Sequence, residues 1–451
     1  MTSRPIAAVI LAAGKGTRMK SDLHKVLHPV GGQPMLLKLI SEFGHLDLKK
    51  SVVVVGADAE SVRGAAEADG VSFAYQTEQL GTAHAALQAR DALAGFDGDV
   101  LICFGDVPLL KAATVERMQQ RLVADDAPAC VVLGFRPQDP KAYGRVIADD
   151  HGRIEKMVEY KDASDTERAC TLCNAGPLMA RGSEVFNLLA RISNDNAQGE
   201  YYLPYLVNVA AADGRRSAVV EAPEREVAGV NDRRDLARAE ALFQEEQREA
   251  MMVAGVSLRA PETVFFSYDT QIASDVVVEP NVVFGPGVTV ESGANIRAFS
   301  HIEGAHIGPD CEVGPYARLR PGAKLERGAK IGNFVEMKKA TLGEGAKANH
   351  LTYLGDADVG PRANIGAGTI TCNYDGFFKY RTEIGADAFI GSNSALVAPV
   401  RIGSEAIVGA GSTVTSDVAD GDLRLERADQ ADKPGWAARF RKAMAEKKAR
   451  G

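Results

Sequence analysis

The sequence predicts an α/β protein in three parts: a layered α/β domain, a linking helix and a coil of short parallel strands. Three observations support this prediction. Short apolar runs alternate with helical patterns up to about residue 228, apolar residues then recur every three or four positions, and aliphatic residues after 253 recur every six positions. We therefore place the parts at residues 1–230, 231–252 and 253–451.

The apolar runs of the first part have the length of buried strands. Typical runs are SVVVVG (51–56), DVLICFGD (99–106) and CVVLGF (130–135). Strands that alternate with helical stretches form a mostly parallel sheet with helices on its faces. We expect ligands at the carboxyl ends of these strands, where open α/β sheets bind them.

The second part reads as one helix. In residues 231–252, Leu236, Ala239, Leu242 and Phe243 follow one another at three- and four-residue spacing. We expect this stripe to be buried and the charged face to be solvated.

The third part repeats with a period of six. A six-residue step is one short strand plus a turn, and three steps make a triangular coil with aliphatic residues inside. The pattern indicates a parallel β-helix built from hexapeptide repeats and resembles the left-handed form, with a local interruption between about 337 and 383. The repeated positions are Ile272, Val278, Phe284, Val290, Ile296 and Ile302, then Ile307, Val313, Leu319, Leu325 and Ile331, and finally Ile384, Ile390, Leu396, Ile402, Val408 and Val414.

Composition argues against several classes of protein. The net charge of −8 disfavours nucleic-acid binding unless there is a strong local patch. The one candidate is the basic tail 439–450, which we read as a solvated helix or frayed end, with a surface for anionic partners as the alternative. The six cysteines are mostly scattered singly, which suits a reducing cytoplasm, and the Cys170–Cys173 pair is read as structural. No segment has the 18 apolar residues of a membrane span. We expect a soluble, cytoplasmic protein.

A glycine-rich basic loop follows the first apolar run. Gly14-Lys15-Gly16-Thr17-Arg18 matches neither the dinucleotide fingerprint nor the Walker loop. Glycines after a strand nevertheless allow backbone N–H groups to approach an anion, and Lys15, Arg18 and Lys25 add positive charge. Asp106 lies just beyond another strand, where a carboxylate is able to hold Mg²⁺. A strand-end aspartate on its own is more often a turn or helix cap.

Longer motifs give this loop a specific resemblance. LAAGKGTRM (11–19) and LHKVLHPVGG (23–32) resemble the nucleotide loop of sugar-1-phosphate nucleotidyltransferases, with a Rossmann-like domain. QTEQLGTAHA, GDVP, AYGRV, VEYKD, CNAGP, GEYYL and GVN follow in the order used by the uridylyltransferase family. The resemblance implies Lys25 and Arg18 as catalytic residues and Asp106 and Asn231 as Mg²⁺ ligands. It implies that the UTP and UDP-sugar site contains Leu11, Ala12, Ala13, Gly14, Lys25, Gln76, Gly81, Thr82, Gly105, Asp106, Gly144, Glu159, Asn174 and Asn231.

A second polar cluster falls in the interruption of the hexads. RLRPGA (318–323), NFVEMKKA (333–340), NHLTYLGD (349–356) and NIGAGTITCNYDG (364–376) are not needed by a purely structural coil. With these motifs the chain resembles, over nearly its whole length, the bifunctional N-acetylglucosamine-1-phosphate uridylyltransferases and glucosamine-1-phosphate acetyltransferases. It implies synthesis of UDP-N-acetylglucosamine for peptidoglycan and lipopolysaccharide from UTP and acetyl-CoA. Hexapeptide acyltransferases commonly form trimers, so a homotrimer is expected.

An acetyltransferase must remove a proton from the attacking amine, and imidazole titrates near neutrality. His350 is therefore the expected general base. The resemblance implies that glucosamine 1-phosphate is bound by Arg320, Lys338, Tyr353, Asn364 and Lys379. It implies that acetyl-CoA is bound by Ala367, Asn373, Tyr374, Ser392, Ala410 and Arg427.

Two positions depart from the family pattern, and two other functions compete with this one. His24 replaces a proline and Tyr205 an aspartate. The first alternative is a nucleotidyltransferase whose β-helix is only an oligomerisation arm. The second is a catalytically silent scaffold. His350 and Lys338 argue against the first alternative, and Lys25, Asp106 and Asn231 argue against the second.

Overall fold

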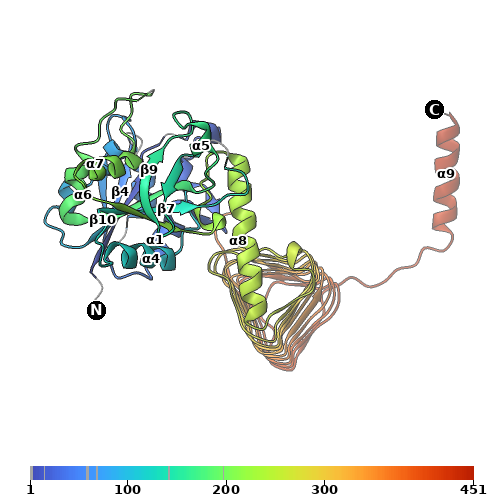
Figure 1. The fold of residues 1–451 in the computed structure, drawn as a ribbon. Helices are drawn as coiled ribbons and strands as arrows, with labels where there is room; N and C mark the ends of the chain where they lie inside the picture. The colour runs from blue at the N-terminus through green and yellow to red at the C-terminus, as the bar shows by residue number, and fades with distance from the viewer. Residues whose placement is uncertain are drawn as a thin grey trace. The chain divides into compact units, whose positions relative to one another are not determined.

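The computed structural model describes residues 4–14, 16–56, 60–67, 70–140, 143–196 and 198–450. Lys15 lies outside these ranges. The chain divides into two compact units, Met1–Glu249 and Ala250–Gly451. Each unit has its own core and is described separately (Figure 1).

A nine-stranded sheet forms the centre of the first unit, in the order β5-β4-β1-β6-β10-β7-β11-β9-β8. Its first four strands are parallel, so their carboxyl ends meet at one edge of the sheet. These strands are β1 (Ile6–Ala12), β4 (Leu48–Val55), β5 (Val71–Tyr75) and β6 (Asp99–Phe104).

The other half of the sheet is largely antiparallel, so the prediction of a mostly parallel sheet is wrong there. Strand β10 (Cys173–Arg181) runs antiparallel to β6 and to β7 (Cys130–Phe135). Apolar runs identify buried strands, but they carry no information on direction. The remaining strands are β8 (Arg145–Ala148), β9 (Arg153–Val158) and β11 (Ser217–Glu221), with β2 (Pro29–Val30) and β3 (Gln33–Pro34) in a separate ribbon.

Helices cover both faces of the large sheet because β1 alternates its side chains between them. Ala8 and Ile10 pack with α1 (Met35–Phe43) and α4 (Ala112–Leu122), whereas Ala7 and Val9 pack with helices on the other face. The other helices are α2 (Glu60–Ala66), α3 (Thr82–Leu87), α5 (Asp165–Arg168), α6 (Gly182–Leu189) and α7 (Leu206–Ala212). Short 3₁₀ helices are η1 (Thr17–Met19), η2 (Lys25–Leu27), η3 (Asp91–Leu93), η4 (Leu203–Tyr205), η5 (Glu224–Val227) and η6 (Pro261–Thr263).

The long helix α8 (Arg233–Val253) packs through a narrow apolar stripe. Ala239 and Phe243 are buried in a cluster that includes Met19. The Phe243 ring lies so close to Gly31 that a Cβ atom there would come within 2.2 Å of it. A residue larger than glycine at position 31 would therefore displace Phe243, and with it α8, from this packing contact.

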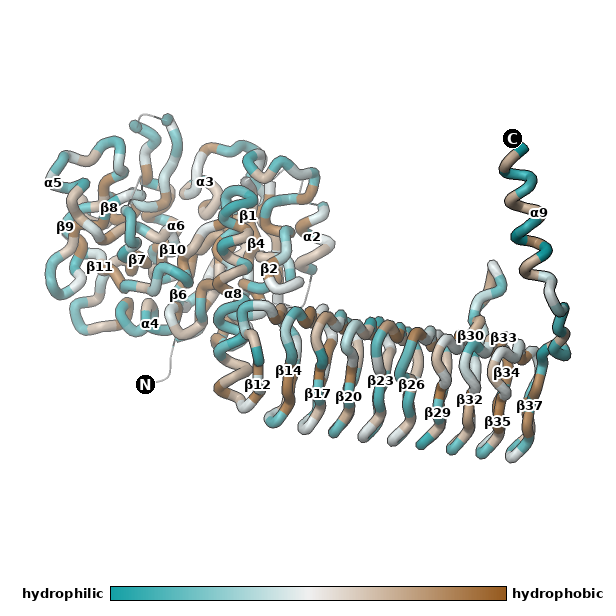
Figure 2. The backbone as a smooth tube through the Cα atoms, turned by 90° about the vertical axis from the view of Figure 1, so that its right-hand side faces the viewer, coloured by the Kyte–Doolittle hydropathy of each residue, from teal (hydrophilic) through white to brown (hydrophobic). Residues whose placement is uncertain are grey.

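The second unit is a left-handed parallel β-helix with three faces. Figure 2 shows the successive coils, and strands of the first face pair in parallel along its whole length. The first face contains β12 (Ser257–Leu258), β14 (Val277–Val278), β17 (Asn295–Ile296), β20 (Glu312–Val313), β23 (Lys330–Asn333), β26 (Lys347–His350), β29 (Asn364–Ile365), β32 (Phe389–Ile390), β35 (Ile407–Val408) and β37 (Leu423–Arg424).

The other two faces have eight strands each. The second face contains β13 (Gln271–Ile272), β16 (Thr289–Val290), β19 (Ala305–Ile307), β22 (Ala323–Leu325), β25 (Thr341–Leu342), β28 (Ala357–Val359), β31 (Thr382–Ile384) and β34 (Val400–Ile402). The third face contains β15 (Val283–Phe284), β18 (His301–Ile302), β21 (Arg318–Leu319), β24 (Glu336–Lys338), β27 (Tyr353–Gly355), β30 (Ile370–Cys372), β33 (Ala395–Val397) and β36 (Thr413–Val414).

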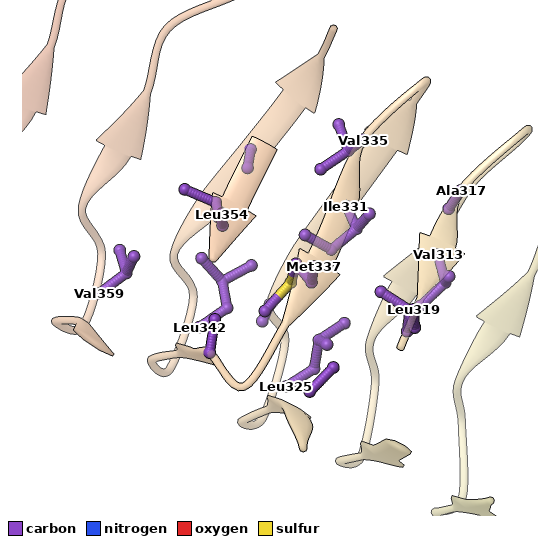
Figure 3. Close-up of a cluster of buried hydrophobic side chains, with 14 of the residues drawn as sticks. Val313, Ala317, Leu319, Leu325, Ile331, Val335, Met337, Leu342, Leu354 and Val359 are labelled. Carbon is purple, nitrogen blue, oxygen red and sulfur yellow. The ribbon is translucent and has the colours of Figure 1, made fainter. Parts of the chain in front are cut away.

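Aliphatic side chains fill the interior of the coils. Val313, Leu319, Leu325 and Ile331, which belong to the predicted hexad register, are all buried there (Figure 3). The coils continue through the predicted interruption, where β24 to β30 keep their pairing. Within the predicted interruption, the described segment 373–381 leaves the prism, as a loop between β30 and β31 (Figure 2).

Stacked aromatic rings line one corner of the prism. Phe299 and Tyr316 stack at a centroid distance of 4.9 Å, and Tyr316 and Phe334 at 5.3 Å. All three residues are exposed and have φ between 56° and 61°. Such a conformation is unfavourable for bulky side chains.

The basic tail forms helix α9 (Trp436–Arg450), whose residues are all exposed. Among the described residues, every helix is too short or too polar to cross a lipid bilayer.

Candidate active sites

A cavity of about 280 Å³ opens at the carboxyl ends of the parallel strands in the first unit. Nine of the predicted nucleotide-binding residues line it, together with Val26, Gln79, Ala85, Phe104 and Glu200. The nine are Leu11, Ala12, Ala13, Gly14, Lys25, Gln76, Gly81, Thr82 and Asp106. Gly105 lies directly behind this wall, and its N–H donates to the carbonyl of Leu11 at 3.0 Å.

Each predicted metal ligand is held by one predicted catalytic cation. Lys25 forms an ion pair with the Asp106 carboxylate, and Arg18 donates to Asn231 Oδ1 at 2.9 Å. The two ligands come from segments far apart in the sequence. The Val230 N–H joins those segments by donating to the Asp106 carbonyl at 2.9 Å.

A buried amide forms the opposite wall of the cavity. Gln76 is 4% exposed, and its Nε2 lies 3.1 Å from the Gly81 carbonyl and 3.1 Å from His84 Nδ1. Gly81 has φ of 115°, and a Cβ atom there would approach the Tyr201 carbonyl to 2.5 Å. Glycine is therefore required at this position.

The predicted sugar residues gather around a smaller cavity. It is lined by Gly144, Glu159 and Asn174, and the Asn174 N–H donates to the Gly144 carbonyl at 2.9 Å. Burial, with a smaller contribution from the nearby Asp162, raises the pKa of Glu159. Tyr205, the departure from the family pattern, also lines this cavity.

The sequence did not predict five of the residues that line the larger cavity, and two of these five, Gln79 and Glu200, have polar side chains. Gln79 donates to the Ala13 carbonyl at 2.8 Å and so joins the glycine-rich loop to the opposite wall. Gln79 lies in QTEQLGTAHA and Glu200 in GEYYL, two of the motifs that carry the family resemblance. Membership of these motifs was the signal that could have identified both residues.

In the second unit, His350 stands at the end of β26 with its imidazole exposed. Its Nδ1 lies 2.8 Å from Asn333 Oδ1, and the two residues pair across adjacent strands. An amide oxygen accepts only, so Nδ1 carries the hydrogen and Nε2 presents a lone pair. Asn333 was not predicted as a site residue. It lies 17 residues before His350, which is about one coil, and this separation in the sequence was the available signal.

The positions predicted for acetyl-CoA continue in a column from His350, one coil after another. The N–H groups of Gly368, Asn393 and Gly411 donate to the carbonyls of His350, Ala367 and Ser392 at 3.2, 2.7 and 2.8 Å. At the far end, Arg427 Nη1 donates to the Ala410 carbonyl at 3.1 Å.

Cations predicted to bind the sugar phosphate meet on the third face. Repulsion from Lys379, then from Arg320, lowers the pKa of Lys338. Arg320 is held at 2.7 Å by Glu336, and Tyr353 pairs with Glu336 across adjacent strands. Asn364 lies instead on the first face, opposite Lys347.

The loop 373–381 carries the remaining predicted residues. Asn373 is buried and donates to Asp356 Oδ2 at 2.5 Å, which ties the loop to the prism. Tyr374 is 60% exposed, and its hydroxyl donates to the Gly376 carbonyl within the loop. The structure therefore does not bring Tyr374 into hydrogen-bond contact with His350.

Comparison with known proteins covers both units. Residues 8–167 match the MobA-like NTP transferase domain, and residues 381–416 match the bacterial transferase hexapeptide family of six repeats. The bifunctional protein GlmU of Sphingopyxis alaskensis is 63% identical over 99% of both chains. The bifunctional protein GlmU of Rhizorhabdus wittichii is 65% identical over 100% of this chain and 99% of its own, and that of Zymomonas mobilis is 53% identical over 98% and 99%. The chain therefore belongs to the GlmU family of bifunctional transferases, which combine uridylyl transfer and acetyl transfer in one polypeptide.

Proposed function

We propose that the first unit transfers a uridylyl group from UTP to N-acetylglucosamine 1-phosphate. The sugar phosphate oxygen attacks the α-phosphorus of UTP, a new P–O bond forms, and the bond to pyrophosphate breaks. The observation that carries this proposal is the cavity that joins Lys25 and Asp106 to Gln76 and Gly81. The lining includes the charged side chains of Lys25 and Asp106, which suit phosphates, and the buried amide of Gln76, which suits a base.

Two anions with about six negative charges in total must meet in this reaction, so charge neutralisation is the main demand on the protein. Lys25 and Arg18 are the cations available for it. Their present partners are Asp106 and Asn231, and of these four residues Lys25 and Asp106 line the cavity. We expect both cations to turn to phosphate oxygens when the substrates bind.

The family implies a magnesium ion, and the residues present fit one. Asp106 and Asn231 offer a carboxylate and an amide oxygen, which are the hard ligands that Mg²⁺ prefers, and each already binds a positive side chain. The described residues contain no cluster of three or more His, Cys, Asp or Glu side chains able to hold a metal. Mg²⁺ usually keeps several waters and uses few protein ligands. When bound, it would neutralise charge on the phosphates.

We propose that the second unit acetylates glucosamine 1-phosphate. The sugar amine attacks the thioester carbonyl of acetyl-CoA, a C–N bond forms, the C–S bond breaks, and coenzyme A leaves as the thiol. His350 Nε2 takes the proton from the amine. The hydrogen bond from Nδ1 to Asn333 supports this role because, in the neutral imidazole, a hydrogen on Nδ1 places the lone pair on Nε2.

The substrates are assigned to the two sides of His350. We propose that Arg320, Lys338 and Lys379 bind the sugar phosphate, which the mutual repulsion of these cations supports. Tyr353 and Asn364 complete this site. The column of Ala367, Ser392, Ala410 and Arg427 holds acetyl-CoA, with Asn373 and Tyr374 beside the reacting groups.

The same proposal includes a homotrimer in the cytoplasm. The exposed stack of Phe299, Tyr316 and Phe334 supports association with further copies of this chain, since apolar patches of this kind mark interaction sites. The six cysteines, all free, support a reducing compartment.

We assign residues 1–230 to uridylyl transfer, 231–252 to the linker and 253–451 to acetyl transfer. Sedimentation of the full chain tests the assembly.

One assay tests both activities. The full chain receives glucosamine 1-phosphate, acetyl-CoA, UTP and Mg²⁺, while free thiol and pyrophosphate are followed. We expect thiol release first and pyrophosphate release after it. Pyrophosphate from added N-acetylglucosamine 1-phosphate without any thiol would indicate that the β-helix is only an oligomerisation arm. A chain that releases neither product would be a scaffold.

A further inference from the structure

The feature of interest is the pair formed by Gln76 and His84 behind the nucleotide cavity. His84 lies on α3, and Gln76 follows β5. Gln76 lines the cavity although its side chain is almost completely buried. The family comparison gives His84 no task, and the uridylyl transfer proposed above does not use it.

The surroundings of Gln76 determine which way its amide points. Its terminal nitrogen faces the Gly81 carbonyl at 3.1 Å, and a carbonyl oxygen is only an acceptor. The same nitrogen lies 3.1 Å from His84 Nδ1, which accepts a hydrogen bond when it carries no hydrogen itself. Both amide hydrogens are then used, and Oε1 is the atom left to face the cavity.

An oxygen acceptor at this position distinguishes the pyrimidine bases. Uracil carries a hydrogen on N3 and donates it to an acceptor. Cytosine has no hydrogen on N3, so its N3 would face the Gln76 oxygen with two lone pairs opposed. Sites built to receive an N–H group discriminate strongly against analogues that lack it, because the buried partner is left unpaired.

His84 is itself held in place by its own helix. Gln88, one turn later, donates to the His84 carbonyl at 3.0 Å. Its amide nitrogen also lies 3.2 Å from His84 Nε2, but a neutral imidazole accepts at only one nitrogen, so the bond from Gln76 to Nδ1 requires that Nε2 carry the ring hydrogen. The ring of Tyr201 lies 6.4 Å from the imidazole. Without the imidazole, the second hydrogen on Gln76 Nε2 would have no acceptor. The amide would then be free to rotate and to direct this hydrogen toward the pyrimidine base.

We propose that His84 is a positioning residue that selects UTP over CTP by fixing the orientation of the Gln76 amide. This inference rests on the proposed uridylyl transfer. It adds a determinant of base specificity that touches neither the nucleotide nor the sugar.

The test compares kcat/KM for UTP and for CTP in the full chain and in two variants. His84→Leu removes the acceptor, and we expect the preference for UTP to fall about tenfold, as for loss of one hydrogen bond, mainly through a higher KM for UTP. His84→Asn places an amide oxygen near the position of Nδ1, and we expect it to retain the preference. Acetyl transfer serves as the internal control and should be unchanged in both variants.

Two results would overturn the inference. The first is an unchanged UTP to CTP ratio in His84→Leu. The second is an equal loss for both nucleotides, which would indicate a purely structural role. A wild-type chain that releases no pyrophosphate from either nucleotide would instead contradict the proposed function, and the inference would fail with it.

Discussion

Asn333 Oδ1 and His350 Nδ1 lie 2.8 Å apart, on strands from adjacent coils of the β-helix. The bond fixes the tautomer of the imidazole and its orientation at the prism corner. We therefore expect Asn333 to determine which nitrogen of His350 serves as the proposed base.

Replacing Asn333 tests this relationship. Asn333→Ala removes the acceptor, and we expect kcat for acetyl transfer to fall about tenfold, the equivalent of one hydrogen bond of about 1.4 kcal/mol. KM for glucosamine 1-phosphate should change little. Asn295→Ala, at an exposed asparagine of the same face, is the matched control. Equal rates in the two variants would remove Asn333 from the site.

The two activities should be lost separately. His350→Ala is expected to reduce acetyl transfer by 10² or more, as for loss of a general base, and to leave uridylyl transfer unchanged. Asp106→Ala should do the reverse. Thiol and pyrophosphate release, measured on each variant with each acceptor sugar, check both expectations. Substantial thiol release by His350→Ala would end its assignment as the base.

Lys25 should matter to rate far more than to folding. Its ammonium is expected to neutralise phosphate charge during transfer, so Lys25→Ala should lower kcat for uridylyl transfer by about 10² or more. Lys49→Ala, which removes an exposed lysine paired with Asp47, is the control. Pyrophosphate release at saturating UTP gives the comparison. Near-normal turnover of Lys25→Ala would contradict the role.

Glu159 links pH to sugar binding. Burial raises the pKa of its carboxyl, so the ionised form is lost at a higher pH than for an ordinary glutamate as the solution is acidified. We expect KM for N-acetylglucosamine 1-phosphate to rise on that acid side. The raised pKa also means that ionised Glu159 destabilises the fold at neutral pH. Glu159→Gln should therefore melt at a higher temperature while binding sugar more weakly.

Glu155→Gln, at an exposed position on β9, the strand that ends just before Glu159, supplies the control. It should leave both the melting temperature and the KM profile as they are. The same shift in both variants would show that strand charge, rather than the buried carboxyl, is responsible.

Lys338 should lose its proton earlier than an ordinary lysine, because Lys379 and Arg320 lower its pKa. As pH rises, we expect KM for glucosamine 1-phosphate to increase at a correspondingly lower pH. Lys379→Met removes the largest cause and should move this increase to higher pH. Lys324→Met, on the second face, should not. The pH dependence of KM, normalised to each variant, provides the measurement.

The sequence predicted the parts of the molecule that follow a local rule. Val313, Leu319 and Leu325 are buried where the six-residue period placed them, and Asp106 stands beyond its strand. The antiparallel course of β10 was not predicted, because strand direction depends on connections and not on apolar content. The pairing of Gln76 with His84 depends on a side-chain orientation that only the folded loop defines.

The interruption of the hexads shows a similar limit. Between 337 and 383 the interior steps from Met337 to Leu342 and from Leu354 to Val359 are five residues long, and the buried positions 348 and 371 are alanine and threonine. The period is therefore obscured although the coil continues. Only 373–381 departs from it. Shorter steps and small or polar interior residues therefore conceal the repeat without interrupting it.

The column from His350 to Arg427, proposed above as the acetyl-CoA site, spans several successive coils. Successive coils advance by the spacing between neighbouring strands, about 4.8 Å. The reach from the reacting thioester to the far end of the donor is thus counted in whole coils. Inserting one coil between Ala367 and Ser392 would lengthen the proposed donor site by that spacing. We expect such a chain to prefer acyl donors with a longer carrier arm, while His350 and Asn333 keep their positions.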